Sequence, residues 1–416
     1  MLNRGVDFCR ACDSEDLFLA LGLGESPLAN RLLDHPMESV RSFPLELRVC
    51  SDCGLGQVGE FETPEEIFSD YPYLSSTSKS WVAANQEFAE ELIASSNLKS
   101  GDLVIELASN DGYLLKSFQV NGLDVLGVEP ARNIAEMAVI AGIPTIPEFF
   151  GLELAKKIRS DGLIPKVIVE KNVLAHVTDL KDFIAGIAEL AARDTLVVIE
   201  APTIAQIILG NQFDTIYHEH FSYLSALALS QIFGHFDMEV VGAKKLTTHG
   251  GSFRFFVQKS DSKSSLPVHY HDELSELIGI EKSLRINQAE SWRDTQAQLK
   301  DCVSDFRNWL TESGTDLVTV AYGAAAKGVT LLAACQADFG ALGSLIDNSL
   351  AKAGKFFPIV GSPILTEAEF ISKADGARFR YVIFPWNLVE EIVPRIKAFD
   401  PQAEVFVAVP VLRRVG

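Results

Sequence analysis

The chain has 416 residues, a formal net charge of −20 at pH 7 and a hydrophobic content of 47%. A chain of this length exceeds one ordinary hydrophobic core, so we expect two or three folded domains. The negative charge disfavours binding to nucleic-acid backbones and to anionic membranes, although a local pocket can still bind a phosphorylated ligand.

The sequence contains no apolar run of membrane-spanning length, and its first residues, MLNRGVDFCRAC, lack the pattern of a signal peptide. We therefore expect a cytoplasmic protein with reduced thiols. We expect neither a membrane nor a nucleic acid as partner. The oligomeric state does not follow from the sequence.

Two Cys-x-x-Cys pairs lie near the start of the chain, Cys9 with Cys12 and Cys50 with Cys53. Their four thiolates form the ligand set of a closed, tetrahedral zinc site. The segment between the pairs is longer than in the usual zinc ribbon. Disulfides and a redox-active pair are the alternatives. We predict a structural Zn²⁺ with no coordination position left for catalysis.

A hydroxyl-rich segment broken by proline follows at Tyr71–Ser78, ahead of an amphipathic helix expected from about Lys79 to Asn97. From such a loop Tyr73 can reach a ligand pocket. A packed surface aromatic is the alternative interpretation.

A βαβ unit is predicted next. A buried strand at Asp102–Ala108 enters a tight turn and a helix, and a second strand, Leu123–Glu129, ends in an acid suited to bind a ribose diol. The dinucleotide motif GxGxxG is absent. The looser Glu-x-Gly-x-Gly-x-Gly pattern of S-adenosylmethionine enzymes corresponds here to Glu106, Ala108, Asn110 and Gly112, so only the last glycine is kept.

The alternation of strands and helices continues with a strand at Lys166–Glu170 and another at Thr195–Glu200. Asn172 and His176 follow the first of these at its carboxyl end, where open α/β sheets bind their ligands. A capping or core histidine is the alternative interpretation of His176.

The segment TIYHEHFSYLS, Thr215–Ser225, carries five titratable side chains within seven residues. Buried polar groups need partners, so this density is unusual for a core and suits a site that moves protons. An exposed loop or a metal-binding loop is the alternative. The side chains concerned are Tyr217, His218, Glu219, His220 and Tyr223.

Strands are predicted at about Glu239–Lys245 and Ser252–Gln258. Arg254, in the second of these, can bind a phosphate bidentately or form an ion pair at the edge of the sheet. A linker rich in serine and lysine, Lys259–Pro267, leads to a helix expected from about Asp272 to Ser313.

A second α/β unit closes the chain. Its strand at Leu317–Tyr322 enters the turn Gly323–Gly328, where small residues let the backbone approach a phosphate and Lys327 adds a charge. A further strand ends at Asp347 and Asn348. Strands at Arg380–Phe384 and Glu404–Val409 complete a small parallel sheet.

Over its whole length the chain resembles the sugar C-methyltransferases that act on dTDP-linked 4-keto-deoxyhexoses. Leu350 departs from the family, which commonly has proline there. The matching segments are CxxC…CxxC, YPYLSSTSKS, ELASNDGYLL, KNVLAHVTDL, YHEHFSYLS, HGGSFR, YGAAAKG, the DNS…P region and FPWN.

The resemblance implies a class I S-adenosylmethionine methyltransferase domain with a Rossmann-like fold. An N-terminal zinc-binding module and a C-terminal Rossmann-like α/β domain flank it. We expect the limits 1–75, 76–260 and 261–416 for the three domains.

The resemblance also implies a mechanism. A base removes the C3 proton next to the 4-keto group, and the enolate carbon takes the methyl group. His220 is the expected base, Tyr217 and Glu219 orient it or the sugar, and Tyr73 and His176 support the site. The expected cofactor site comprises Glu106, Ala108, Asn110, Gly112, Glu129, Pro130 and Asn172, and the expected substrate site comprises Tyr223, Arg254, Lys327 and Asn348.

Two other functions remain open on the sequence. An O- or N-methyltransferase would use the same scaffold on a substrate without an enolisable ketone. A non-catalytic nucleotide-sugar-binding protein would have no need for the dense YHEH segment.

Overall fold

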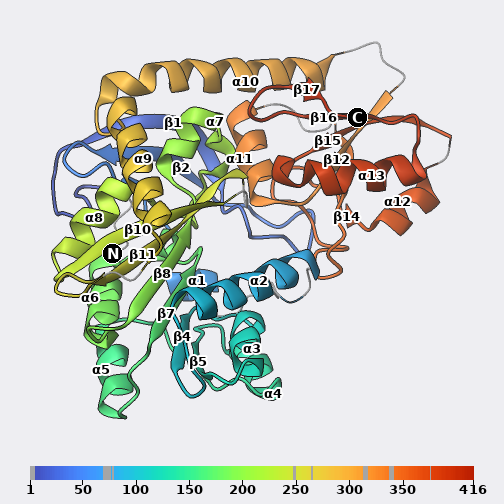
Figure 1. The fold of residues 1–416 in the computed structure, drawn as a ribbon. Helices are drawn as coiled ribbons and strands as arrows, with labels where there is room; N and C mark the ends of the chain where they lie inside the picture. Colours follow the sequence, from blue (N-terminus) through green and yellow to red (C-terminus); the bar gives the residue numbers. More distant parts are fainter. Residues whose placement is uncertain are drawn as a thin grey trace.

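The computed structural model describes residues 5–68, 76, 79–246, 250–263, 266–312, 317–336, 342–374 and 376–416, and three sheets organise them (Figure 1). Tyr73 and His249 lie outside the described residues. Within the described ranges, no helix has both the length and the apolar character needed to cross a membrane.

The N-terminal sheet is antiparallel, in the order β1-β2-β3-β9. Its last strand comes from the middle of the chain, directly after the YHEH residues. The inward side chains of β2, Leu45, Leu47 and Val49, are fully buried, as a half-buried strand requires. The strands are β1 (Leu17–Pro27), β2 (Ser42–Cys50), β3 (Gly56–Gln57) and β9 (Ser222–Tyr223).

The central sheet has the order β10-β11-β8-β7-β4-β5-β6, with only β11 antiparallel to its neighbours. Continuous apolar runs such as LVIEL in β4 are buried on both faces, as parallel strands between two helix layers must be. The strands are β4 (Leu103–Leu107), β5 (Asp124–Val128), β6 (Thr145–Ile146), β7 (Val167–Lys171), β8 (Leu196–Ala201), β10 (Met238–Leu246) and β11 (Ser252–Lys259).

The C-terminal sheet has the doubly wound order β14-β13-β12-β15-β16-β17, parallel except for β17. The predicted fold class is confirmed by these three sheets. The strands are β12 (Leu317–Tyr322), β13 (Leu342–Ile346), β14 (Ile364–Leu365), β15 (Arg378–Ile383), β16 (Glu404–Val407) and β17 (Arg413–Arg414).

Helices cover the sheets, and α10 lies across the N-terminal and C-terminal parts (Figure 1). The α-helices are α1 (Pro64–Phe68), α2 (Lys79–Ser95), α3 (Tyr113–Val120), α4 (Arg132–Ile140), α5 (Leu152–Ser160), α6 (Leu180–Leu190), α7 (Ile204–Gly210), α8 (Ala226–Gly234), α9 (Val268–Leu284), α10 (Arg293–Thr311), α11 (Ala326–Cys335), α12 (Glu367–Lys373) and α13 (Val389–Phe399). The short 3-10 helices are η2 (Leu174–His176), η3 (Phe213–Thr215), η5 (Ala289–Trp292) and η7 (Trp386–Leu388).

The continuous helix predicted from Asp272 to Ser313 is wrong. α9 ends where Arg285 adopts a left-handed conformation, with φ of 50°, and the chain turns before α10 begins. The Trp292 indole N–H donates to the Ile286 carbonyl and fixes this turn.

Two of the hydrophobic clusters contain residues from more than one of the expected domains. The two cysteine pairs share one hydrophobic cluster with Leu174, Leu224 and other residues of the central part. A second cluster joins β1 and β2 to α10, α11 and the C-terminal sheet. The N-terminal module therefore packs against both α/β units.

Candidate functional site

The turn after β4 has three residues in the left-handed region, Ala108, Asn110 and Gly112, with φ of 53°, 50° and 77°. Only the last needs to be glycine for steric reasons, because a Cβ there would lie 2.8 Å from the Ile143 side chain. Asn tolerates this conformation well, and Ala adopts it at a cost of about 1–2 kcal/mol. The backbone thus keeps the glycine-type turn although two glycines are replaced.

Glu129, at the end of β5, braces this turn. Its carboxylate oxygens accept hydrogen bonds from the backbone N–H groups of Asn110 and Ala131, each at 2.9 Å. Pro130 lies between Glu129 and Ala131 in the chain. Burial raises the pKa of Glu129. The expected ribose contact of Glu129 remains a prediction.

Three buried acceptors in and beside the turn have no hydrogen-bond partner among the described residues: Glu106 Oε2, Ser109 Oγ and Asp111 Oδ1. Burial raises the pKa of Glu106 well above its usual value. Buried polar groups are normally paired, so these atoms mark a place where a ligand with several donors fits. S-adenosylmethionine, with its ammonium group and ribose hydroxyls, has that chemistry.

The turn after β7 carries Asn172 and His176. Asn172 has a φ of 58°, and its N–H donates to the Glu200 carbonyl at 2.6 Å. The buried Glu170 carboxylate accepts from the Leu174 N–H at 2.7 Å and so fixes η2. His176 is thereby held beyond the carboxyl end of β7, the strand next to β4 in the sheet.

His176 lies against the YHEH segment. Its Nδ1 is 2.6 Å from the Glu219 carbonyl oxygen, and its ring lies 4.6 Å from the His220 ring, measured between centroids. Because a carbonyl only accepts, Nδ1 carries the proton. Burial lowers the pKa of His176 to about 4, so the ring is neutral at pH 7.

Tyr217 and His220 form a hydrogen-bonded pair of side chains. Tyr217 Oη is 2.7 Å from His220 Nε2, and the two ring centroids are 4.0 Å apart. Both side chains are half-buried, whereas His218 and Glu219 between them are buried. Tyr217 and His220 therefore lie on one side of the segment, and His218 and Glu219 lie on the other.

Glu219 points into the N-terminal module. Its Oε1 accepts a hydrogen bond from the Asn30 N–H at 2.8 Å. We predicted that this carboxylate would orient the His220 ring, but it is bound to the N-terminal module instead. The Tyr217 hydroxyl is hydrogen-bonded to the His220 ring.

His218 is a structural residue of the same module. Its Nε2 is 3.2 Å from the Pro44 carbonyl oxygen, and its ring packs edge-on against Phe43 and Phe61. Burial lowers the pKa of His218 to about 4.

Of the four expected substrate-binding residues, Tyr223 and Arg254 are engaged inside the protein. Tyr223 Oη accepts from the Tyr217 N–H at 3.0 Å and braces the loop. The Arg254 guanidinium lies 3.9 Å from the Phe88 ring centroid and donates to Glu200 at 3.1 Å. This pairing agrees with the ion-pair interpretation, although β11 is inside the sheet and not at its edge.

Lys327 lies at the carboxyl edge of the C-terminal sheet. Its ammonium group donates to the Asn387 side chain and lies 4.3 Å from the centroid of the Trp386 ring. The Trp386 indole N–H donates to Asp214 at 2.8 Å, just before the YHEH segment. Burial lowers the pKa of Lys327.

Asn348 lies on the same edge, with its amide 2.9 Å from the Tyr322 hydroxyl. The preceding Asp347 accepts from the Ala324 N–H at 2.8 Å. This contact repeats the bond between Glu129 and Asn110, so both α/β units brace the first turn with the acid after the second strand.

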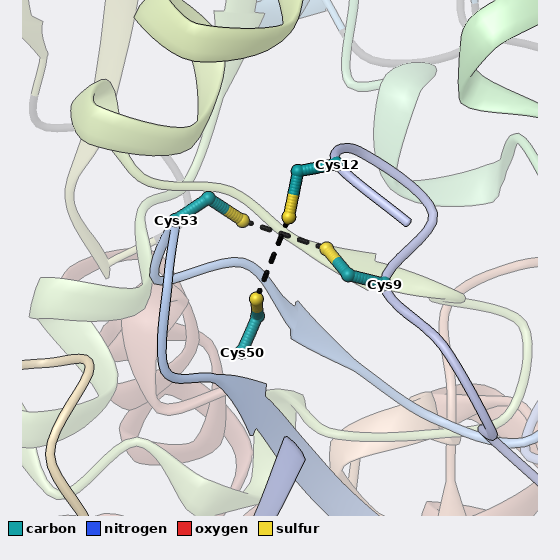
Figure 2. Close-up of side chains that lie close together, drawn as sticks. All are labelled: Cys9, Cys12, Cys50 and Cys53. Atoms are coloured by element: carbon teal, nitrogen blue, oxygen red, sulfur yellow. Dashed lines mark hydrogen bonds between the residues drawn. The ribbon is translucent and has the colours of Figure 1, made fainter. Parts of the chain in front are cut away.

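The four cysteines converge as predicted (Figure 2). All four Sγ atoms lie within 4.8 Å of one another, with 3.4 Å between Cys9 and Cys53 and 3.6 Å between Cys12 and Cys50. These separations exceed a disulfide bond of about 2.05 Å. They suit a tetrahedron with Zn–S bonds of about 2.3 Å, in which sulfurs lie about 3.8 Å apart.

The two knuckles have equivalent backbones. Each ends at a left-handed residue, Asp13 with φ of 60° or Gly54 with φ of 75°. The N–H of that residue donates to the carbonyl of the first cysteine, at 2.9 Å for Cys9 and 3.0 Å for Cys50. The donor set and its frame therefore fit a structural Zn²⁺.

Sequence reasoning missed Arg10, Asp214 and Trp386, which join the modules around the YHEH segment. Their partners are distant in sequence, and the only local signal was the position of Arg10 inside the first knuckle.

Comparison with known proteins gives three family matches. A putative zinc binding domain matches residues 9–68, a methyltransferase domain matches residues 81–243, and a C-methyltransferase C-terminal domain matches residues 247–410. The chain is 30% identical to the C-methyltransferase NovU of Streptomyces niveus over 399 residues, which cover 95% of this chain and 93% of that protein.

Two solved structures are each similar to less than half of the chain. Magnesium protoporphyrin IX methyltransferase from Synechocystis PCC 6803, with bound S-adenosylmethionine, is 15% identical with a TM-score of 0.33, over 43% of this chain and 79% of that chain. The PH0226 protein from Pyrococcus horikoshii OT3 is 10% identical with a TM-score of 0.35, over 48% of this chain and 99% of that chain.

The cysteine cluster predicts about one tightly bound zinc per chain, measurable by elemental analysis of protein purified without added metal. Cys9→Ser should lose zinc and thermal stability, because binding of structural zinc contributes directly to folding. Cys335→Ser, which changes a packing thiol in α11, should keep its zinc. A metal-free wild type of full stability would contradict the assignment.

Glu129→Gln should weaken binding of S-adenosylhomocysteine by about 1–3 kcal/mol in calorimetry, since a charged acceptor beside the turn is lost. Glu136→Gln, on the exposed side of α4, is the matched control and should bind normally. Equal affinities in the two variants would move the ribose contact elsewhere.

His218 predicts a pH effect on stability. Its folded pKa of about 4 lies below the unfolded value of 6.5, so its contribution is complete above pH 6.5 and is lost as pH falls toward 4. The wild type should therefore lose up to about 3 kcal/mol more than His218→Gln between pH 7 and pH 4, measured by denaturation at a series of pH values. If the free energy of unfolding changes with pH equally in the two proteins, His218 is not the group responsible for the loss of stability.

Proposed function

Because this chain belongs to the C-methyltransferase family that combines a zinc-binding and a methyltransferase domain, we propose that it methylates C3 of a nucleotide-linked 4-keto-deoxyhexose. The predicted family, enzyme class, S-adenosylmethionine cofactor and zinc-binding domain are confirmed. The substrate class, the methylated carbon and the roles of the site residues are parts of the proposal. The observation that carries it is the Tyr217–His220 pair, placed beside His176 between two α/β units.

The turn after β4, with Glu106, Ser109, Asp111 and Glu129, holds the cofactor in this proposal. S-adenosylmethionine supplies an electrophilic methyl group there. The protein must then generate a carbon nucleophile on the sugar. The 4-keto group makes this possible because it acidifies the neighbouring C3 proton.

We assign the imidazole of His220 as the acceptor of that proton. An imidazole can take up and return a proton near neutral pH, whereas a phenol normally keeps its proton there. The Tyr217 hydroxyl, 2.7 Å from Nε2, orients the ring. His176 is neutral and adds no positive charge that would oppose protonation of its neighbour.

The C-terminal sheet holds the nucleotide side of the substrate in this proposal. Its switch point lies between β12 and β15, where the small-residue turn and Lys327 can contact a diphosphate. This turn is joined to the base-bearing loop, since the Thr330 hydroxyl in α11 donates to the Ile216 carbonyl at 2.8 Å. The sugar of a bound nucleotide would then reach His220.

The expected location, the cytoplasm, stays part of the proposal. The limits 1–75, 76–260 and 261–416 also stay a proposal. Tyr73 lies outside the described residues, so its supporting role is carried by the resemblance alone.

His220→Asn should keep both ligands bound and lower turnover by about 10²–10⁴-fold, the usual contribution of a general base. It should also stop the wash-in of solvent deuterium at C3 of the substrate, followed by NMR. Exchange tests the base separately from methyl transfer.

His235→Asn is the matched control, because His235 is exposed at the end of α8. It should behave as the wild type. If exchange persists in His220→Asn while methyl transfer fails, His220 only positions the substrate. If no exchange occurs in the wild type, an O- or N-methyltransferase becomes the better description.

A further inference from the structure

Arg10 lies inside the first zinc knuckle, between Cys9 and Cys12, and contacts the base-bearing loop. Its guanidinium donates through Nη1 to the Phe221 carbonyl at 2.7 Å and through Nη2 to the Val58 carbonyl at 3.0 Å. Its own N–H donates to the buried Gln57 side chain at 2.8 Å. Arg10 thus crosses the boundary between β3 and the segment that leads into β9.

Phe221 directly follows His220, and its carbonyl accepts twice. Besides Arg10 Nη1, the Val58 N–H donates to it at 3.1 Å. Immediately afterwards β9 pairs with β3, Tyr223 opposite Gly56 and Ser222 opposite Gln57. The N-terminal module therefore holds the chain directly after His220, from Phe221 to Tyr223.

The same module also holds the residues before Phe221. Asn30 binds the Glu219 carboxylate, and Pro44 accepts a contact from His218. With these side chains directed into the module, Tyr217 and His220 are turned the other way. The module thus shapes the loop that carries the proposed base.

We propose that Arg10 is a positioning residue for His220, through which the zinc knuckle holds the loop in its catalytic geometry. Zinc ligation on both sides restricts the backbone at Arg10. The planar guanidinium, with two donors in fixed directions, transmits that restriction to the carbonyl next to His220. The inference rests on the proposed role of His220.

Arg10→Met removes the donors and keeps much of the apolar stem, and Arg10→Lys keeps the charge without the planar fork. Arg48→Met is the matched control, because the Arg48 side chain forms a half-exposed ion pair with Glu46 in the same sheet. Four quantities are measured in each variant: zinc content, kcat, KM for both substrates, and amide exchange of the segment 217–223 by mass spectrometry.

Arg10→Met should keep its zinc and its KM for S-adenosylmethionine, exchange the 217–223 amides faster, and lose about 10–100-fold in kcat, the scale expected for a misplacement of about 1 Å. Arg10→Lys should recover part of kcat, and Arg48→Met should match the wild type. Normal kcat, unchanged amide exchange or loss of zinc in Arg10→Met would each overturn the proposal.

Failure of the proposed function is distinguishable from failure of this inference. Full activity in His220→Asn would remove the base assignment. Faster exchange at 217–223 in Arg10→Met, beside unchanged exchange in β4, would still show that Arg10 holds the loop.

Discussion

The arrangement depends on the short antiparallel contact between β3 and β9, which joins the zinc-binding module to the loop carrying His220. The second knuckle directly precedes β3 in the chain, and the four cysteines belong to or pack against a hydrophobic cluster that continues into the central α/β unit. The N-terminal module is therefore part of the structure that forms the site. In our proposal the zinc takes no part in the chemistry and determines where the proposed base lies.

A second constraint is electrostatic. His176, which contacts the loop, and His218, which belongs to it, are both neutral at pH 7, because burial lowers the pKa of each to about 4. Burial also raises the pKa of Asp214 to about 7. The two histidines therefore add no charge beside His220, and Arg10 is a cation in contact with the carbonyl of the next residue, Phe221. For His220 to take a proton while Tyr217 stays on Nε2, Nε2–H must donate to the Tyr217 hydroxyl and the other ring nitrogen must accept the proton.

The sequence predicted what depends on local pattern. Strand and turn succession placed Glu106, Gly112 and Glu129 around one turn, and Cys-x-x-Cys spacing placed the metal ligands. It could not predict the direction of Glu219 or the contact of Arg10, because their partners are 189 and 211 residues away. The break between α9 and α10 was also missed, since it depends on a left-handed Arg285, a residue type with no strong preference for that conformation.

The central claim, that the site makes a carbon nucleophile next to a ketone, is tested most directly by the position of the transferred methyl group. Nucleotide-linked 4-keto-deoxyhexoses would be incubated with S-adenosylmethionine carrying a ¹³C-labelled methyl group, and the product analysed by NMR. The account predicts a ¹³C methyl bonded to C3 and coupled through bonds to the C4 carbonyl. A label bonded to oxygen or nitrogen, or no transfer to any such sugar, would contradict it.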